Sequence, residues 1–168
     1  MEPEEREKEK VKREKFALVA GLVVFMVPQF TRAQNELFIG TWNANIAKSS
    51  YVPGAALKSE TLRFEPVGDR FKVSLDGVNR QGPYHSEATG KFDGVDVPVL
   101  ANPARQAAFS YAFSRIDDHT WDIVIKVNGQ RRLVVHNVVS ADGKTMRATS
   151  RVTDTGVVNQ DVIYEKQP

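Results

Sequence analysis

Short segments in which apolar and polar residues alternate are the feature of this sequence that most constrains its fold. Leu62 and Phe64 alternate with polar neighbours, and Phe71, Val73 and Leu75 do the same a few residues later. Side chains of a β-strand point alternately to two faces, so a period of two indicates strands with one buried face. The turn-forming residues between these two segments predict a β-hairpin.

The same alternation continues to the end of the chain. Asn128-Gly129 lies between two such segments, and this dipeptide is typical of a two-residue hairpin turn. No long amphipathic helix competes with the strands. The sequence therefore predicts an all-β fold, an antiparallel up-and-down barrel of about eight to ten strands, because a closed barrel leaves no exposed edge. A two-sheet sandwich is the alternative. The expected strands span residues 38–44, 61–65, 70–76, 84–92, 95–100, 107–116, 120–127, 131–139, 145–153 and 157–165.

The N-terminal segment has the composition of an export signal. Residues 1–15 are mostly charged, and residues 16–27 carry no charge. This uncharged run has the length of a signal-peptide core and is shorter than the roughly 20 residues that cross a bilayer. We expect a signal peptide over residues 1–33, cleaved after Ala33, and a single domain over 34–168, located in the periplasm or outside the cell. An uncleaved membrane anchor is the alternative.

Composition excludes several kinds of function. The chain has 168 residues, which suits one domain, and it contains no cysteine, which rules out disulfides and thiolate chemistry. Its 23 basic and 21 acidic residues nearly balance and form no basic stripe, so we expect no nucleic-acid partner. Contact with a membrane is expected only through an uncleaved N-terminal segment. The sequence does not set the oligomeric state.

The first predicted strand carries a motif of a known barrel family. Gly40-Thr41-Trp42 resembles the Gly-x-Trp opening of lipocalins and related calycin barrels, and the segments 40–54, 93–98, 141–146 and 164–166 resemble a group of exported bacterial lipocalin-like proteins. The resemblance implies structural roles for Gly40 and Trp42, with the indole closing one end of the barrel. It also implies a basic residue that packs on Trp42, and Arg151 is the candidate.

The C-terminal segment is similar to a second barrel family. Residues 163–166 look like the last strand of cytosolic fatty-acid-binding proteins. That resemblance implies an arginine two residues before Tyr164, where it would hold a fatty-acid carboxylate. Val162 occupies this position, so the carboxylate-binding interpretation loses its main residue.

No recognisable catalytic or metal-binding motif is present. His85, His119 and His136 do not have the spacing of a metal site, and the chain lacks a nucleophile elbow, a phosphate loop and a dinucleotide fingerprint. We therefore expect no catalytic residues, no metal and no cofactor.

The remaining hypothesis is a barrel that binds a small apolar or amphipathic molecule without catalysis. In one strand Phe109, Tyr111 and Phe113 share a face, but the sequence does not decide whether this face points inward. The candidate ligand-binding residues are Trp42, Phe64, Tyr84, Phe109, Tyr111, Trp121, His136 and Arg147. Two alternatives stay open: a packed structural or interaction protein of the cell envelope, and an enzyme on the same scaffold.

Overall fold

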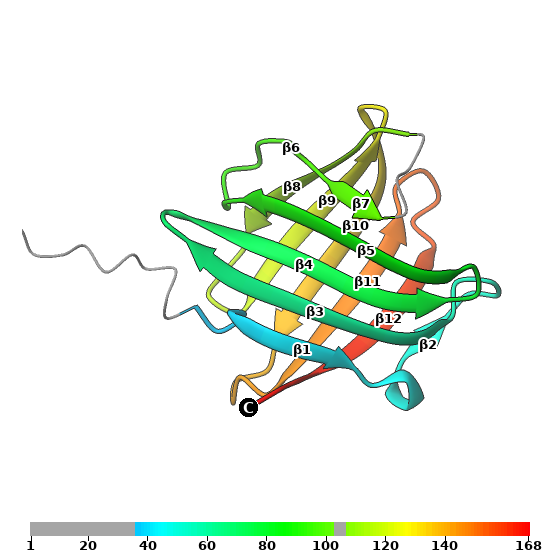
Figure 1. Ribbon diagram of the computed structural model, residues 1–168, viewed down its shortest axis with the longest axis horizontal. Coiled ribbons are helices and arrows are strands. Elements are labelled where there is room, and N and C mark those ends of the chain that lie inside the picture. Colours follow the sequence, from blue (N-terminus) through cyan, green and yellow to red (C-terminus); the bar gives the residue numbers. More distant parts are fainter. Residues whose placement is uncertain (1–35, 103–106) are drawn as a thin grey trace, which may run out of the picture.

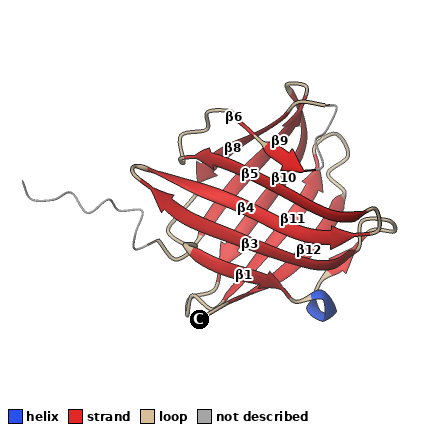
Figure 2. Cartoon of the chain, in the orientation of Figure 1, coloured by secondary structure: helices blue, strands red, loops and turns tan. Residues whose placement is uncertain are grey.

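The computed structural model describes residues 36–102 and 107–168, and the predicted signal peptide lies outside these ranges. Most of the described chain is strand, and its only helix is the short 3-10 turn η2 (Ile46–Lys48) (Figure 2). No helix in the described ranges is long and apolar enough to cross a membrane. The strands are β1 (Gly40–Ala44), β2 (Ser50–Tyr51), β3 (Leu57–Val67), β4 (Arg70–Asn79), β5 (Gly82–Gly90), β6 (Val97–Pro98), β7 (Leu100–Asn102), β8 (Phe109–Arg115), β9 (Thr120–Val127), β10 (Gln130–Val139), β11 (Thr145–Val152) and β12 (Val158–Lys166).

The strands form one continuous antiparallel sheet that curls into a nearly closed barrel. Its order is β6-β8-β9-β10-β11-β12-β1-β3-β4-β5-β7, with β2 paired to β12 outside this path. The strands β1, β3, β4 and β5 make one wall and cross over the wall formed by β8 to β12 (Figure 1). Most neighbours are joined by tight turns, and Asn128 and Gly129 both have positive φ as the predicted two-residue turn requires.

The all-β antiparallel prediction is confirmed, but the predicted number of strands is wrong. Twelve strands are present among the described residues instead of eight to ten. The expected strand at 95–100 is divided into β6 and β7, which pair with different neighbours, β8 and β5. The two-residue strand β2 was not predicted. Strands of two or three residues are too short to display an alternation of apolar and polar side chains.

One end of the barrel interior is filled by aromatic rings, which we call the aromatic plug. Its members pack mostly edge to face, and the rings of Phe71 and Phe92 have centroids 4.9 Å apart. Phe113 comes close enough to β5 that a Cβ on Gly90 would lie 2.8 Å from its ring. The plug consists of Phe38, Phe64, Phe71, Phe92, Phe113 and Trp121. Close-packed rings of this kind fill the interior at this end with side chains.

Trp42 is fully buried beside the plug, and its basic partner is Lys166. The indole Nε1 donates to the Phe38 carbonyl at 2.7 Å, and the Lys166 ammonium lies 5.0 Å from the indole ring centroid. Lys166 also donates to the Leu37 carbonyl at 2.8 Å, and burial lowers its pKa. Gly40 has φ +129°, and a side chain there would collide with Lys166. Gly40 therefore leaves room for the cation.

The expected pairing of Arg151 with Trp42 is not present. Lys166 is the cross-strand partner of Trp42, whereas Arg151 pairs with Val158 at the opposite end of β12. The side chain of Arg151 is exposed on the outer face of β11. The strand register thus places a different cation on the indole.

Candidate functional site

The barrel interior beyond the aromatic plug is hollow. An outer cavity of about 290 Å³ opens near the turns at Gly54 and Gln81, and an inner cavity of about 150 Å³ lies deeper. Both are lined by Glu60, Leu75, Ser86, Tyr111, Ile125, Leu133 and Gln160, so they adjoin. This combination of an apolar lining with a few polar groups is what a small-molecule site requires.

Three of the eight residues expected to contact a ligand line these cavities. Tyr84 and Phe109 face the outer cavity, and Tyr111 faces both. The aromatic face of β8 therefore points inward, which settles the orientation that the sequence left open. Ala112 on the opposite face of β8 is buried without lining either cavity.

Three other candidates are buried but lie away from the cavities. Trp42, Phe64 and Trp121 pack in or beside the aromatic plug, with exposed fractions of 0%, 1% and 2%. Their aromatic character marked them as candidate cavity-lining residues. In the folded chain these large rings stabilise one end of the barrel.

The last two candidates lie on the outside of the barrel. His136 pairs with Asp122 through a 2.7 Å contact between Nδ1 and Oδ1, and Arg147 is bonded through two nitrogens to the Asp161 carboxylate. Each aspartate lies on the strand next to that of its partner. Asp122 is directly opposite His136 in the strand register. The two side chains therefore stabilise cross-strand pairs and do not reach the interior.

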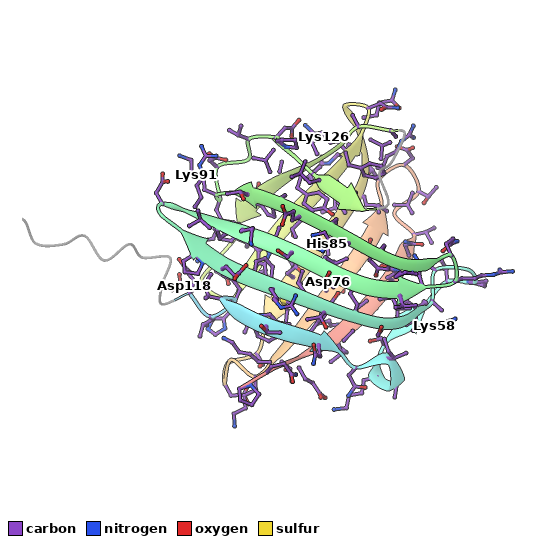
Figure 3. All side chains as sticks on the ribbon, in the orientation of Figure 1. Lys58, Asp76, His85, Lys91, Asp118 and Lys126 are labelled. Atoms are coloured by element: carbon purple, nitrogen blue, oxygen red, sulfur yellow. The ribbon has the colours of Figure 1, made fainter. Side chains whose placement is uncertain are left out.

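The other midstrand histidine also belongs to an outer cross-strand pair. His85 on β5 (Figure 3) contacts Asp76 on β4 at 2.7 Å. Arg63 donates to the same carboxylate at 2.8 Å. These interactions lower the pKa of Asp76, with the His85 hydrogen bond as the largest cause. No group of three or more potential metal-ligating side chains occurs among residues 36–102 and 107–168.

The chemically distinctive residue of the interior is Glu60 on β3. Its carboxylate is buried and accepts hydrogen bonds from two tyrosine hydroxyls, Tyr84 on Oε2 and Tyr164 on Oε1. Of the described residues that line either cavity, Glu60 alone carries an acidic or basic side chain other than tyrosine. We call Glu60, Tyr84 and Tyr164 the acidic triad.

The strand register brings the triad together across five strands. Glu60 pairs with Gly77 on β4, and Gly77 pairs with Tyr84 on β5. A Cβ on Gly77 would lie 2.5 Å from Cζ of Tyr84, so the missing side chain allows the phenol ring to cross β4 and reach Glu60. On the other side, Tyr164 on β12 pairs with the small residue Ala44 on β1. The two tyrosines thus converge on one carboxylate from opposite sides, with Gly77 leaving the space through which Tyr84 reaches it.

Burial controls the protonation of the triad. Desolvation raises the pKa of Glu60, while the hydrogen bonds from Tyr164 and Tyr84 oppose this rise. Desolvation also raises the pKa of the fully buried Tyr164 well above its ordinary value, and the nearby Glu60 charge adds to the effect. Tyr164 therefore remains a neutral hydrogen-bond donor to the carboxylate.

The sequence contains a signal for Glu60 that our sequence analysis missed. Leu62 and Phe64 were assigned to the inner face of their strand, and two residues earlier the same face carries Glu60. The same step of two along β12 places Gln160, Val162 and Tyr164 inward. A carboxylate on an otherwise apolar face is a recognisable mark of a site, because buried acids are rare unless paired.

One solved structure supports this architecture. No protein-family model matches the chain, and no curated protein sequence matches it significantly. Among solved structures, a Schistosoma mansoni fatty acid binding protein in complex with arachidonic acid is 17% identical with a TM-score of 0.57, covering 79% of this chain and 97% of that protein. A redesigned β-barrel, mFAP1, bound to DFHBI, is 12% identical with a TM-score of 0.42, covering 81% of this chain and 97% of that one. The first likeness shows that this chain has a β-barrel fold similar to that of the fatty acid binding protein.

Proposed function

We propose that this protein is an exported barrel that binds a small apolar or amphipathic molecule in its interior without catalysis. The observation that carries the proposal is the pair of adjoining cavities, about 290 and 150 Å³, between the aromatic plug and the turns at Gly54 and Gln81. A barrel built only as a packed scaffold would fill this volume with side chains, because voids in protein cores reduce stability.

The lining of the cavities supports a mixed apolar and polar ligand. Val73, Ile123 and Val135 supply apolar surface, while Asn137 and Ser150 place buried polar groups against the same space. The Asn137 amide is held by donation to the Val135 carbonyl at 3.1 Å, so it presents a fixed orientation. The fatty acid binding protein complex offers a parallel for this mode of binding on a similar fold.

A cavity-filling substitution tests the proposal. Ser150→Phe should abolish the binding of decanol, measured by titration calorimetry on the full chain, because the new ring occupies the inner cavity. Thr145→Phe is the matched control, since it adds the same side chain at an exposed position of the same strand. Equal decanol affinity in both variants would contradict an interior site. Adding a large side chain to a protein interior can reduce stability by about 1–3 kcal/mol. Ala148→Leu, which fills the same cavity with a smaller side chain, is therefore the second variant.

Export is the part of the proposal that depends on residues 1–33. The uncharged run over 16–27 and the small residues before position 34 support cleavage after Ala33. N-terminal sequencing of the protein recovered from the periplasm or the medium should begin at Gln34. A protein that stays with the membrane and retains residues 1–33 would indicate the anchor instead.

A further inference from the structure

We propose that the cavity selects amphipathic amines, molecules with an apolar body and a protonated primary or secondary amino group, and disfavours carboxylate ligands. The inference rests on the proposed interior site and adds the chemical class of its ligand. It is carried by the acidic triad, which places a buried carboxylate at the boundary of the two cavities.

The hydrogen-bonding capacity of the triad is the first reason. Both phenolic hydrogens are directed to Glu60, one to each carboxylate oxygen. Each carboxylate oxygen has more than one lone pair, so Glu60 can accept from a ligand as well, while the phenolic hydrogens are already engaged. An ammonium group has donors and no acceptor, which makes it complementary, whereas a ligand carboxylate has only acceptors.

Charge is the second reason. Glu60 is 9% exposed, and none of the described residues lining the cavities is lysine, arginine or histidine. A cationic ligand would place a countercharge beside Glu60, in a medium where charge pairs interact strongly. When Glu60 is ionised, an anionic ligand would place a second negative charge beside it, which is unfavourable for the same reason.

The shape of the site is the third reason. The apolar residues Leu62, Val73 and Val162 line the inner cavity next to Tyr164, so a hydrocarbon body can lie there while its amino group meets Glu60. The cavity mouth is lined by uncharged polar residues, Asn79 and Gln81. Nothing at this mouth competes with Glu60 for a cation among the described residues.

Three ligands that have the same number of carbons and differ in their head group separate the effect of head-group charge from that of the hydrocarbon. Titration of the full-length protein at neutral pH with decylamine, decanol and decanoate should show the amine binding tightest and the acid weakest. We expect roughly tenfold or more between amine and alcohol, the ratio typical of one hydrogen bond to a charged group. Glu60→Gln, which keeps the shape of the side chain, should remove most of the preference for the amine and leave the affinity for decanol similar.

The results of these titrations distinguish the preference for amines from the existence of an interior binding site. Binding of decanoate at least as tight as that of decylamine, or an amine preference that survives Glu60→Gln, would overturn the amine assignment while leaving the interior site intact. Absence of binding for all three ligands would overturn the interior site itself. Glu65→Gln, on the same strand with an exposed side chain, is the control for loss of negative charge, and it should retain the amine preference.

Discussion

The phenol ring of Tyr84 lies directly across the backbone of Gly77, and this contact brings the Tyr84 hydroxyl to the buried carboxylate of Glu60. Gly77 has an ordinary extended backbone, so the absence of a side chain, and not an unusual φ, is what the position requires. The arrangement links a single glycine on β4 to the chemistry of the interior.

Replacing Gly77 by Ala should therefore displace Tyr84 and break its hydrogen bond to Glu60. We expect a loss of stability of about 1–3 kcal/mol, the usual penalty for leaving a buried polar group without a partner, and weaker decylamine binding. Urea denaturation measures the first effect and calorimetry the second. In a Tyr84→Ala background the same glycine substitution should be much less harmful. Additive effects of the two changes would show that Gly77 does not act through Tyr84.

Removing the Tyr164 hydroxyl should reduce the stability of the protein more than removing the Tyr84 hydroxyl. Tyr164 is buried at 4% exposure, whereas Tyr84 is only half-buried. Tyr164→Phe leaves one oxygen of a buried carboxylate without its donor, at a cost of about 2 kcal/mol, while water can replace the hydroxyl more readily in Tyr84→Phe. Equilibrium denaturation of both variants provides the comparison. Equal losses would mean that both phenols are solvated alike.

Glu60 should make stability depend on pH. Burial raises its pKa in the folded protein above that of the unfolded chain. As pH rises above the ordinary glutamate value of about 4.3, the unfolded chain ionises first and is stabilised, so the free energy of unfolding falls until the raised folded-state pKa is passed.

The Glu60→Gln variant should lack this fall and should be more stable than wild type at neutral pH. Denaturation midpoints measured between about pH 4 and pH 8 test the prediction, with Glu65→Gln as the exposed control. A wild-type curve that rises with pH while the Glu60→Gln curve stays flat would mean that folding lowers the pKa of Glu60, which is the opposite of the predicted direction.

Lys166, and not Arg151, should be the basic side chain that stabilises Trp42 through a cation–π contact. Lys166→Met should reduce stability by about 1 kcal/mol, the magnitude of a partly buried cation–π contact, and should also remove the hydrogen bond to the Leu37 carbonyl. Arg151→Met is the matched control because that side chain is exposed on β11, opposite Val158 at the far end of β12 from Lys166, and the change should be nearly neutral. A larger loss for Arg151→Met would restore the pairing expected from the sequence.

Arg147 and His136, on the outside of the barrel, should not affect ligand binding. Arg147 and His136 make cross-strand pairs with Asp161 and Asp122 and do not line either cavity. Arg147→Met and His136→Gln should therefore leave the titration with decylamine unchanged. A marked loss of affinity in either variant would place that residue in the site.

Alternation of side chains predicts the strands, and it would also have placed Glu60 on the inner face, since Glu60 precedes Leu62 and Phe64 by steps of two. It does not predict which strands become neighbours when the sheet closes. Tyr164 reaches Glu60, and Lys166 rather than Arg151 reaches Trp42, because β12 pairs with β1. Hydrophobicity alone also does not separate Phe64, which packs in the plug, from Tyr111, which lines the cavities. These distinctions depend on three-dimensional register.

The most direct test of an amine-binding interior is a crystal structure of the full chain grown with decylamine. We predict that the hydrocarbon chain occupies the inner cavity and that the amine nitrogen lies about 3 Å from the Glu60 carboxylate. An amine bound only on the outer surface, with the interior collapsed or filled by protein side chains, would contradict both the interior site and its preference for amines.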